Sequence, residues 1–395
     1  MTRNRELSAA LRREIRVRRL VARAYPDPFL ENLPPAGALP PLAKGRIPLG
    51  KLVFGQVVSL EIGLRGTARN ILVCGPTGTG KTNFLRQHLL AASGQAIIVV
   101  FDRKGDLESV AGYAQDGEVV VLDRQDVKLA LLQVIPGMEE DDFIALITEV
   151  LAQNLHLMAS RRLISDSLYL LFRRKNQGQA RVSINDLIEL VERIRVDPVS
   201  RLGQYREAVL FALKDLSRRS GGILDHTESN FLQEVFSRPR TFIIRAGSIP
   251  VDHLGVVVSL FYMFVYERRR LSRQTQPPVM IVVDDALLIA TGSMEWETEG
   301  ARNPIATWSF HGRSFNIGLV VSVQNFSPIS PALRNNADTL VWLGSSGEDA
   351  AAVATHMNLN HDQSQELQGI PVGQAIVLAR SVWPYAVRAW IPEVG

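Results

Sequence analysis

The residues Gly75-Pro-Thr-Gly-Thr-Gly-Lys-Thr82 constrain the fold of this chain more than any other feature. They satisfy the pattern G-x-x-x-x-G-K-[ST], in which a glycine-rich loop joins a buried strand to a helix. The required context is present, because an apolar run at Asn70–Cys74 precedes the loop and a helical pattern at Asn83–Ala92 follows it. The sequence therefore predicts a phosphate-binding loop at the carboxyl end of a buried strand.

Each residue type in this loop has a chemical reason to be there. Gly75, Gly78 and Gly80 permit backbone dihedrals that aim successive N–H groups at one anion, and the helix N-terminus adds its positive dipole end. Lys81 supplies charge to the β and γ phosphates of a nucleotide, and the Thr82 hydroxyl suits Mg²⁺. We therefore expect every residue of the loop to contact the nucleotide, namely Gly75, Pro76, Thr77, Gly78, Thr79, Gly80, Lys81 and Thr82.

Short apolar runs alternate with amphipathic stretches through the rest of the chain. Such continuous runs are typical of strands buried on both faces, so we expect an α/β fold with a mainly parallel sheet between helices. The strands expected are Asn70–Cys74, Ala96–Asp102, Glu118–Leu122, Thr241–Arg245, Val279–Asp284, Ile317–Val323, Thr339–Leu343 and Gln374–Ala379.

The domain organisation follows from where this alternation stops. Between residues 138 and 236 the strand pattern gives way to helical periodicity, which predicts an all-α subdomain inserted in the α/β core. The core would then consist of residues 46–137 and 237–395, and residues 1–45 would form a basic arm followed by a proline-rich linker.

Polar residues follow two of the expected strands. Asp284 and Asp285 come directly after an apolar run, where Asp284 would reach a metal through water and Asp285 would polarise the attacking water. Adjacent carboxylates after a strand can instead cap a helix. Gln324 follows the run Ile317–Val323, where its amide can hydrogen-bond both a water and the γ-phosphate, or serve as a structural amide.

Positive charge is concentrated at the beginning of the chain. Residues 1–25 hold eight arginines and two glutamates, a net charge of +6, whereas the whole chain has a net charge of +4. Leu7, Leu11 and Ile15 recur at helical spacing among these arginines. The arm could therefore dock on the body or a neighbouring subunit, hold nucleic acid, or contact an acidic membrane surface.

The compartment is indicated by two further features. Cys74 is the single cysteine, so no intrachain disulfide can form, as is usual in a reducing compartment. No apolar run reaches the roughly 20 residues that a transmembrane helix needs. We expect a cytoplasmic protein with no transmembrane segment.

The ordered motifs resemble those of the HerA/FtsK-like P-loop ATPases, which include the TraG-like coupling ATPases of conjugation. The resemblance extends from Ile47 to Pro392, and the helical stretch is placed like the all-α domain of coupling ATPases. Beside the glycine-rich loop and Asp284, it is carried by Ile47–Gly50, Phe101–Asp106, His311–Arg313, Ser322–Gln324 and Leu333–Leu343.

The resemblance implies a RecA-like (ASCE) fold, ATP and Mg²⁺ as ligands, and a homo-hexamer with ATP between subunits. An arginine from the neighbouring subunit would complete each site; Arg313 is the first candidate, and Arg334 and Arg302 are alternatives. With Lys81, Asp285 and Gln324, Arg313 would make up the catalytic set.

The function implied is ATP-driven translocation of DNA, double- or single-stranded, in conjugation or DNA processing. Two alternatives share the same motor chemistry: packaging of a viral genome, and a secretion motor whose helical insert recruits protein partners. For the conjugation and secretion roles we expect recruitment to a membrane complex.

Two positions depart from the pattern of the family. Asp285 and Asp106 stand where glutamate is common, and aspartate is one methylene shorter. The departures predict slow turnover, a repositioned water, or use of another carboxylate such as Glu295 or Glu297.

Overall fold

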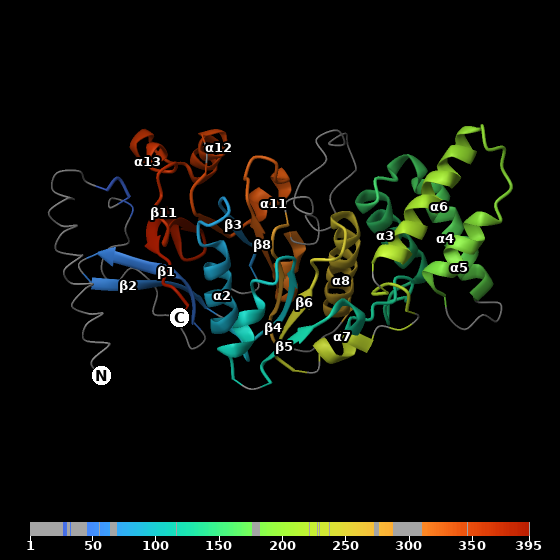
Figure 1. The fold of residues 1–395 in the computed structure, drawn as a ribbon, viewed down its shortest axis with the longest axis horizontal. Coiled ribbons are helices and arrows are strands. Elements are labelled where there is room, and N and C mark those ends of the chain that lie inside the picture. The colour runs from blue at the N-terminus through green and yellow to red at the C-terminus, as the bar shows by residue number, and fades with distance from the viewer. Residues whose placement is uncertain are drawn as a thin grey trace.

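The computed structural model describes most of the chain from residue 46 onward. The described residues are 27–29, 32, 46–54, 56–63, 69–115, 117–175, 182–220, 222–226, 228, 230–236, 238–271, 276–286, 310–345 and 347–394. The predicted arm at residues 1–25 lies outside them, as do Glu295, Glu297 and Arg302. The described residues form an 11-stranded sheet in the order β2-β1-β11-β10-β9-β3-β8-β7-β4-β6-β5 (Figure 1).

Seven neighbouring strands of this sheet run parallel, and they contain the glycine-rich loop. Strand β3 pairs with both β8 and β9, and β7, β4, β6 and β5 continue the parallel part beyond β8. In chain order the bounds are β3 (Ile71–Cys74), β4 (Ile97–Asp102), β5 (Val119–Leu122), β6 (Thr241–Arg245), β7 (Val279–Val283), β8 (Ile317–Val323) and β9 (Thr339–Trp342). These strands match the predicted runs to within a residue at each end.

Burial on both faces explains why the parallel strands are apolar throughout. In β4, Ile97, Val99 and Phe101 belong to the core on one face of the sheet, while Ile98 and Val100 belong to the core on the other. A strand with both faces covered has no polar alternation, as the sequence predicted.

The remaining four strands form antiparallel pairs, which the sequence did not predict. The run Gln374–Ala379 is strand β10, but it lies antiparallel to β9. Strands β11 (Trp383–Trp390), β1 (Arg46–Phe54) and β2 (Gln56–Gly63) were not predicted. Pro48 and Gly50 lie at a register shift in β1 and Pro384 lies in β11, and proline and glycine weaken a strand pattern.

Two long helices cover opposite faces of the parallel strands. Helix α2 (Lys81–Ala92) contributes Phe84 and Leu89 to one core, and α8 (Val251–Leu271) contributes Leu254 and Phe261 to the other. The helices α11 (Pro331–Asn336), α12 (Gly347–Met357) and α13 (His361–Gln365) lie between β8 and β10 in the chain. No described helix is long and apolar enough to cross a membrane.

The stretch between β5 and β6 is helical, as its periodicity predicted. It contains α3 (Glu140–Asn154), α4 (Arg161–Lys175), α5 (Ile184–Glu192), α6 (Arg201–Arg219) and α7 (Asn230–Val235). Ser183 opens α5 in a capping box with Asp186, which the sequence also indicated. Helices α3 to α6 gather at one end of the molecule, beyond α8 and away from β1 and β2 (Figure 1). Their apolar side chains are continuous with the core under α8.

The described part of the proline-rich segment lies against β11. The Trp383 indole Nε1 donates to the Asn32 carbonyl oxygen at 2.6 Å, and the Asn32 amide donates to the Ala386 carbonyl oxygen at 2.9 Å. Arg388 pairs with Asp27 at 3.0 Å. These contacts attach Asp27 and Asn32 to the antiparallel end of the sheet.

Candidate functional site

The glycine-rich loop between β3 and α2 uses its glycines in two different ways. Gly78 and Gly80 have φ angles of 86° and 103°, which residues with side chains rarely adopt. Gly75 is not among the described residues with a positive φ angle. It is required for space, because a Cβ at Gly75 would lie 2.9 Å from the Leu343 Cβ atom and 2.7 Å from the Thr79 Oγ1 atom.

Lys81 lies inside this loop with only 7% of its surface exposed. Its ammonium group donates to the carbonyl oxygen of Gly75 and, at 2.8 Å, to that of Pro76. Burial lowers the pKa of Lys81, and the nearby charge of Lys104 lowers it further, against the opposing effect of Asp284 and Asp285. A buried ammonium held by neutral carbonyls would be stabilised by an anion, which fits phosphate binding.

Asp284 follows β7 and is a buried carboxylate with an unsatisfied oxygen. It is 2% exposed, its N–H donates to the Phe101 carbonyl oxygen at 3.3 Å, and its Oδ2 atom has no hydrogen-bond partner among the described residues. A carboxylate oxygen left unpaired in this way is costly unless a cation or donor completes it. Together with the half-buried Thr82 on the first turn of α2, Asp284 provides the oxygen donors that suit Mg²⁺.

Asp285 is held in an unusual conformation with both carboxylate oxygens contacted. Its φ angle is 53°, in the left-handed region. The Gln324 amide donates to Oδ1 at 3.2 Å, and the Lys104 ammonium lies 3.5 Å from Oδ2. Because β8 lies between β3 and β7, Gln324 emerges between the glycine-rich loop and the two aspartates. The structure therefore brings Lys81, Asp284, Asp285 and Gln324 to one edge of the sheet.

Lys104 was not predicted as a site residue. It follows β4, the parallel neighbour of β7, in a turn organised by Asp102. The Asp102 carboxylate accepts the N–H groups of Lys104, Gly105 and Leu107 at 3.1, 3.0 and 2.9 Å. Burial raises the pKa of Asp102 above its ordinary value despite these donors. The sequence signal for Lys104 is its place shortly after the apolar run Ala96–Asp102, as Gln324 follows the run Ile317–Val323.

Among the described residues, no hydrogen bond or ion pair joins Arg313 or Arg334 to this group. Arg313 begins the turn η6 (Arg313–Phe315) before β8, at the opposite end of that strand from Gln324, and its side chain is exposed. Arg334 lies on α11 before β9, with its guanidinium 5.3 Å from the centre of the Phe326 ring. An arginine that acts on a neighbouring subunit does not need to approach its own nucleotide loop, so these assignments stay predictions.

More than half of the chain matches a known protein family. Residues 47–265 match the family described as "Helicase HerA, central domain". The chain belongs to this family. The resemblance to HerA/FtsK-like P-loop ATPases that the ordered motifs indicated is therefore confirmed. A search of curated protein sequences gave no match.

Solved structures similar to this HerA-family chain include those of VirB4 and TrwB. VirB4 of Thermoanaerobacter pseudethanolicus aligns with a TM-score of 0.64 and 16% identity, over 89% of this chain and 98% of that one. Plasmid coupling protein TrwB, in complex with the GTP analogue GDPNP, aligns with a TM-score of 0.62 and 16% identity over 91% and 97%. TrwB in complex with ADP and Mg²⁺ gives 0.61 and 15% over 85% and 87%. At such identities the likeness concerns the fold, and it confirms the RecA-like, mainly parallel α/β class.

Proposed function

We propose that this chain is an ATP-hydrolysing motor that moves DNA as a homo-hexamer. The observation that carries the proposal is the meeting of a buried ammonium, Lys81, an unsatisfied carboxylate, Asp284, and a contacted carboxylate, Asp285, at one sheet edge. These groups match the needs of a nucleoside triphosphate and its hydrolysis. Membership of a family named for the helicase HerA supports the assignment to a motor.

The residues divide the chemistry among themselves. Lys81 and the N–H groups at the start of α2 bind the phosphates, as P-loops do. Asp285 accepts a proton from the attacking water, and Gln324 orients that water and Asp285 toward the γ-phosphate. Thr82 and Asp284 would hold Mg²⁺, which when bound neutralises charge on the phosphate oxygens. The products are ADP and inorganic phosphate.

The proposal also names DNA as the substrate and a homo-hexamer as the working form of the protein. TrwB is described as a bacterial conjugative coupling protein, and it has been captured with ATP-analogue and ADP–Mg²⁺ ligands. Arg313 is proposed to reach the nucleotide of the neighbouring copy from its exposed turn. The arginine-rich residues 1–25 and a cytoplasmic location with recruitment to a membrane complex belong to the same proposal.

The test is phosphate release by the full chain with ATP and Mg²⁺, alone and with double- or single-stranded DNA. We expect basal hydrolysis that one form of DNA increases. Lys81→Ala should remove it, and Lys128→Ala, an exposed lysine outside the site, should not. Hydrolysis that survives Lys81→Ala would overturn the site, and a rate indifferent to both kinds of DNA would overturn the DNA motor.

A motor acting on protein is the second candidate. It is favoured by the exposed apolar side chains of Val199 and Phe211 in the helical segment, which are 83% and 75% exposed. Stimulation of the ATPase by a protein partner and not by DNA would select it. Genome packaging would share the DNA response and differ only in the substrate molecule.

A further inference from the structure

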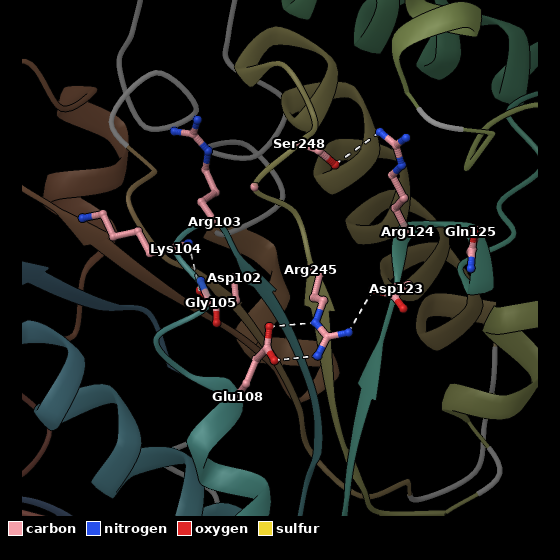
Figure 2. A pocket seen from close by; sticks show the side chains of 11 residues that line it. Asp102, Arg103, Lys104, Gly105, Glu108, Asp123, Arg124, Gln125, Arg245 and Ser248 are labelled. Carbon is pink, nitrogen blue, oxygen red and sulfur yellow. Dashed lines mark hydrogen bonds and ion pairs between the residues drawn. The ribbon is translucent and has the colours of Figure 1, made fainter.

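We propose that a pocket beside the nucleotide site binds the phosphate backbone of nucleic acid. The proposal rests on the proposed DNA function and names a contact site for it. The pocket has a volume of about 470 Å³ and lies where β4, β5 and β6 end (Figure 2). In open α/β sheets, the carboxyl ends of parallel strands are where ligands bind. This pocket and the nucleotide site thus share one edge of the sheet.

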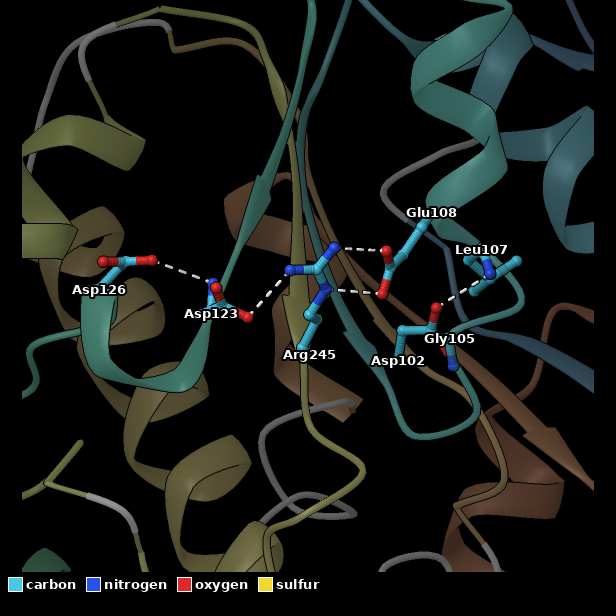
Figure 3. Close-up of polar contacts among 7 residues, drawn as sticks. All are labelled: Asp102, Gly105, Leu107, Glu108, Asp123, Asp126 and Arg245. Carbon is cyan, nitrogen blue, oxygen red and sulfur yellow. Dashed lines mark hydrogen bonds and ion pairs between the residues drawn. The ribbon is translucent and has the colours of Figure 1, made fainter.

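The carboxylates of the pocket already have hydrogen-bond donors. Arg245, at the end of β6, donates from Nε and Nη2 to the two Glu108 oxygens at 2.8 and 2.7 Å, and from Nη1 to Asp123 at 3.0 Å (Figure 3). These contacts lower the pKa of Glu108 and raise that of Arg245. Asp102 is 1% exposed and accepts the N–H groups of its own turn. Each of the three lining acids therefore has hydrogen-bond donors within the pocket, and the single charge of Arg245 is shared between Glu108 and Asp123.

Two arginines of the pocket lack a carboxylate partner. Among the described residues, the Arg124 guanidinium contacts the Ser248 hydroxyl at 3.2 Å, and the Arg103 Nε atom is buried with no hydrogen-bond partner. Figure 2 shows the Arg103 and Arg124 side chains projecting in the same direction from opposite sides of the pocket. Lys104 points elsewhere, toward Asp285. The guanidinium groups of the pocket that have no carboxylate partner are thus those of Arg103 and Arg124.

The chemistry of the lining selects a phosphate backbone. Arginine, serine and backbone groups are the usual partners of nucleic-acid phosphates. The described lining contains no aromatic side chain on which a base could stack, so it does not fit a second free nucleotide. The contact would be independent of base sequence, which suits a protein that moves along a polymer.

The position of Arg103 connects this contact with hydrolysis. Arg103 and Lys104 are consecutive residues of the turn held by Asp102, and the Lys104 ammonium contacts Asp285. A phosphate bound by Arg103 would act on the same turn that places Lys104. Occupancy of the pocket is therefore expected to alter the rate of ATP hydrolysis through Lys104 and Asp285.

The test replaces Arg103 and Arg124 by glutamine, singly and together, in the full chain. Binding of labelled duplex and single-stranded oligonucleotides is measured by fluorescence anisotropy at several salt concentrations without ATP. We expect affinity to fall about tenfold for each arginine removed, since a hydrogen bond to a charged group contributes on this scale. For duplex DNA the salt slope should fall by about 0.9 for each phosphate that is no longer neutralised. The matched control is Arg193→Gln at the C-terminal cap of α5, an exposed arginine paired with Glu189, which should change neither quantity.

Each other result would overturn the proposal in a different way. If the parent protein binds DNA and the double variant binds with the same affinity and slope, the pocket proposal is wrong and the DNA motor stands. If the parent binds no DNA at low salt, both fail. If the double variant loses DNA binding and light scattering shows that it also loses the oligomer, the pocket proposal is wrong. The pocket would then hold acidic side chains of a neighbouring copy. Thermal unfolding checks the fold, and the single variants keep the test decisive should the double variant not fold.

Discussion

Two groups of charged side chains lie along the same sheet edge and differ in how completely they are paired. In the pocket, the Arg245 guanidinium bonds to both Glu108 oxygens and to Asp123. In the nucleotide site, the Asp284 Oδ2 atom has no partner among the described residues and Lys81 donates to neutral carbonyls. An unpaired buried charge destabilises a protein that holds no ligand, so its presence marks a position that a ligand completes. Paired charges such as Arg245 and Glu108 instead fix loops in place.

The largest expected effect is on the chemical step in the nucleotide site. Asp285→Asn should lower kcat by about 10²- to 10⁴-fold, because an amide cannot accept the proton of the attacking water. Asparagine tolerates the left-handed backbone at this position, so the turn should persist. Single-turnover phosphate release measures the chemical step, and a separate nucleotide-binding measurement shows whether the site is intact.

The matched control for this substitution is Asp141→Asn, at an exposed position in the first turn of α3. It should leave kcat within about twofold of the parent value, because surface substitutions away from special contacts have small effects. If Asp285→Asn turns over normally, the proton acceptor lies elsewhere, and Glu295 and Glu297 become the positions to test.

A second effect concerns acid stability and the unpaired imidazole on α2. His88 is 1% exposed, neither ring nitrogen has a partner among the described residues, and burial lowers its pKa to about 4. Because the folded pKa is lower than the unfolded value near 6.5, its contribution is complete above about pH 6.5 and is lost as the pH falls toward 4. The loss amounts to about 3 kcal/mol of unfolding free energy.

Urea unfolding of the parent and of His88→Leu at pH 7.5, 5.5 and 4.5 measures this effect. The variant removes the titrating group while keeping a similar volume, so its stability should decline less between pH 7.5 and 4.5. Parallel pH curves for the two proteins would show that His88 is hydrogen-bonded or hydrated in solution.

A third effect has opposite signs for stability and activity. Asp284→Asn removes a buried charge that lies near Asp102, so the ligand-free protein should gain about 1–3 kcal/mol of unfolding free energy. The same change should abolish Mg²⁺-dependent hydrolysis, and it should remove the rise in melting temperature that we expect when Mg²⁺ and ADP are added to the parent protein. A ligand-free variant less stable than the parent would mean that Asp284 is a structural residue.

The smallest effect is expected in the paired group. Glu108→Gln keeps the shape but removes the charge that Arg245 contacts, and these side chains are 29% and 48% exposed. Exposed ion pairs contribute little, so the melting temperature should fall by no more than about 2 °C. If Glu108→Gln lowered the melting temperature more than any nucleotide-site substitution did, the charges of the pocket would matter more for stability than those of the nucleotide site.

Much of the fold was predictable because its strands are buried on both faces. Strands β6, β8 and β10 begin and end at the predicted residues, since each is an apolar run with polar or glycine residues beside it. The direction of β10 was not predictable from its own residues, because direction depends on the connection and not on burial. The strands β1 and β11 were missed because prolines interrupt them and one face of β11 is partly exposed.

The site was predictable to the extent that it depends on strand ends. Asp284, Asp285 and Gln324 each follow an apolar run, and parallel strands bring such residues to one edge. The contacts of Asp285 with Lys104 and of Glu108 with Arg245 depend on β4 lying between β7 and β6. Strand order is set by packing over long distances in sequence, so these pairs needed the structure. The roles of Arg313 and residues 1–25 stay predictions.

The place of β3 between β8 and β9 also bears on how the chain is made. Asn70, just before β3, accepts a hydrogen bond from the N–H of Leu319, which is 249 residues later in the sequence. At about 5–20 residues per second, a ribosome would need roughly 10 to 50 seconds after β3 to deliver its first partner strand. Throughout that interval an apolar strand has no partner, which favours slow folding and association with other nascent chains. The production of this protein in cells should therefore depend on chaperones more than its folded stability alone would suggest.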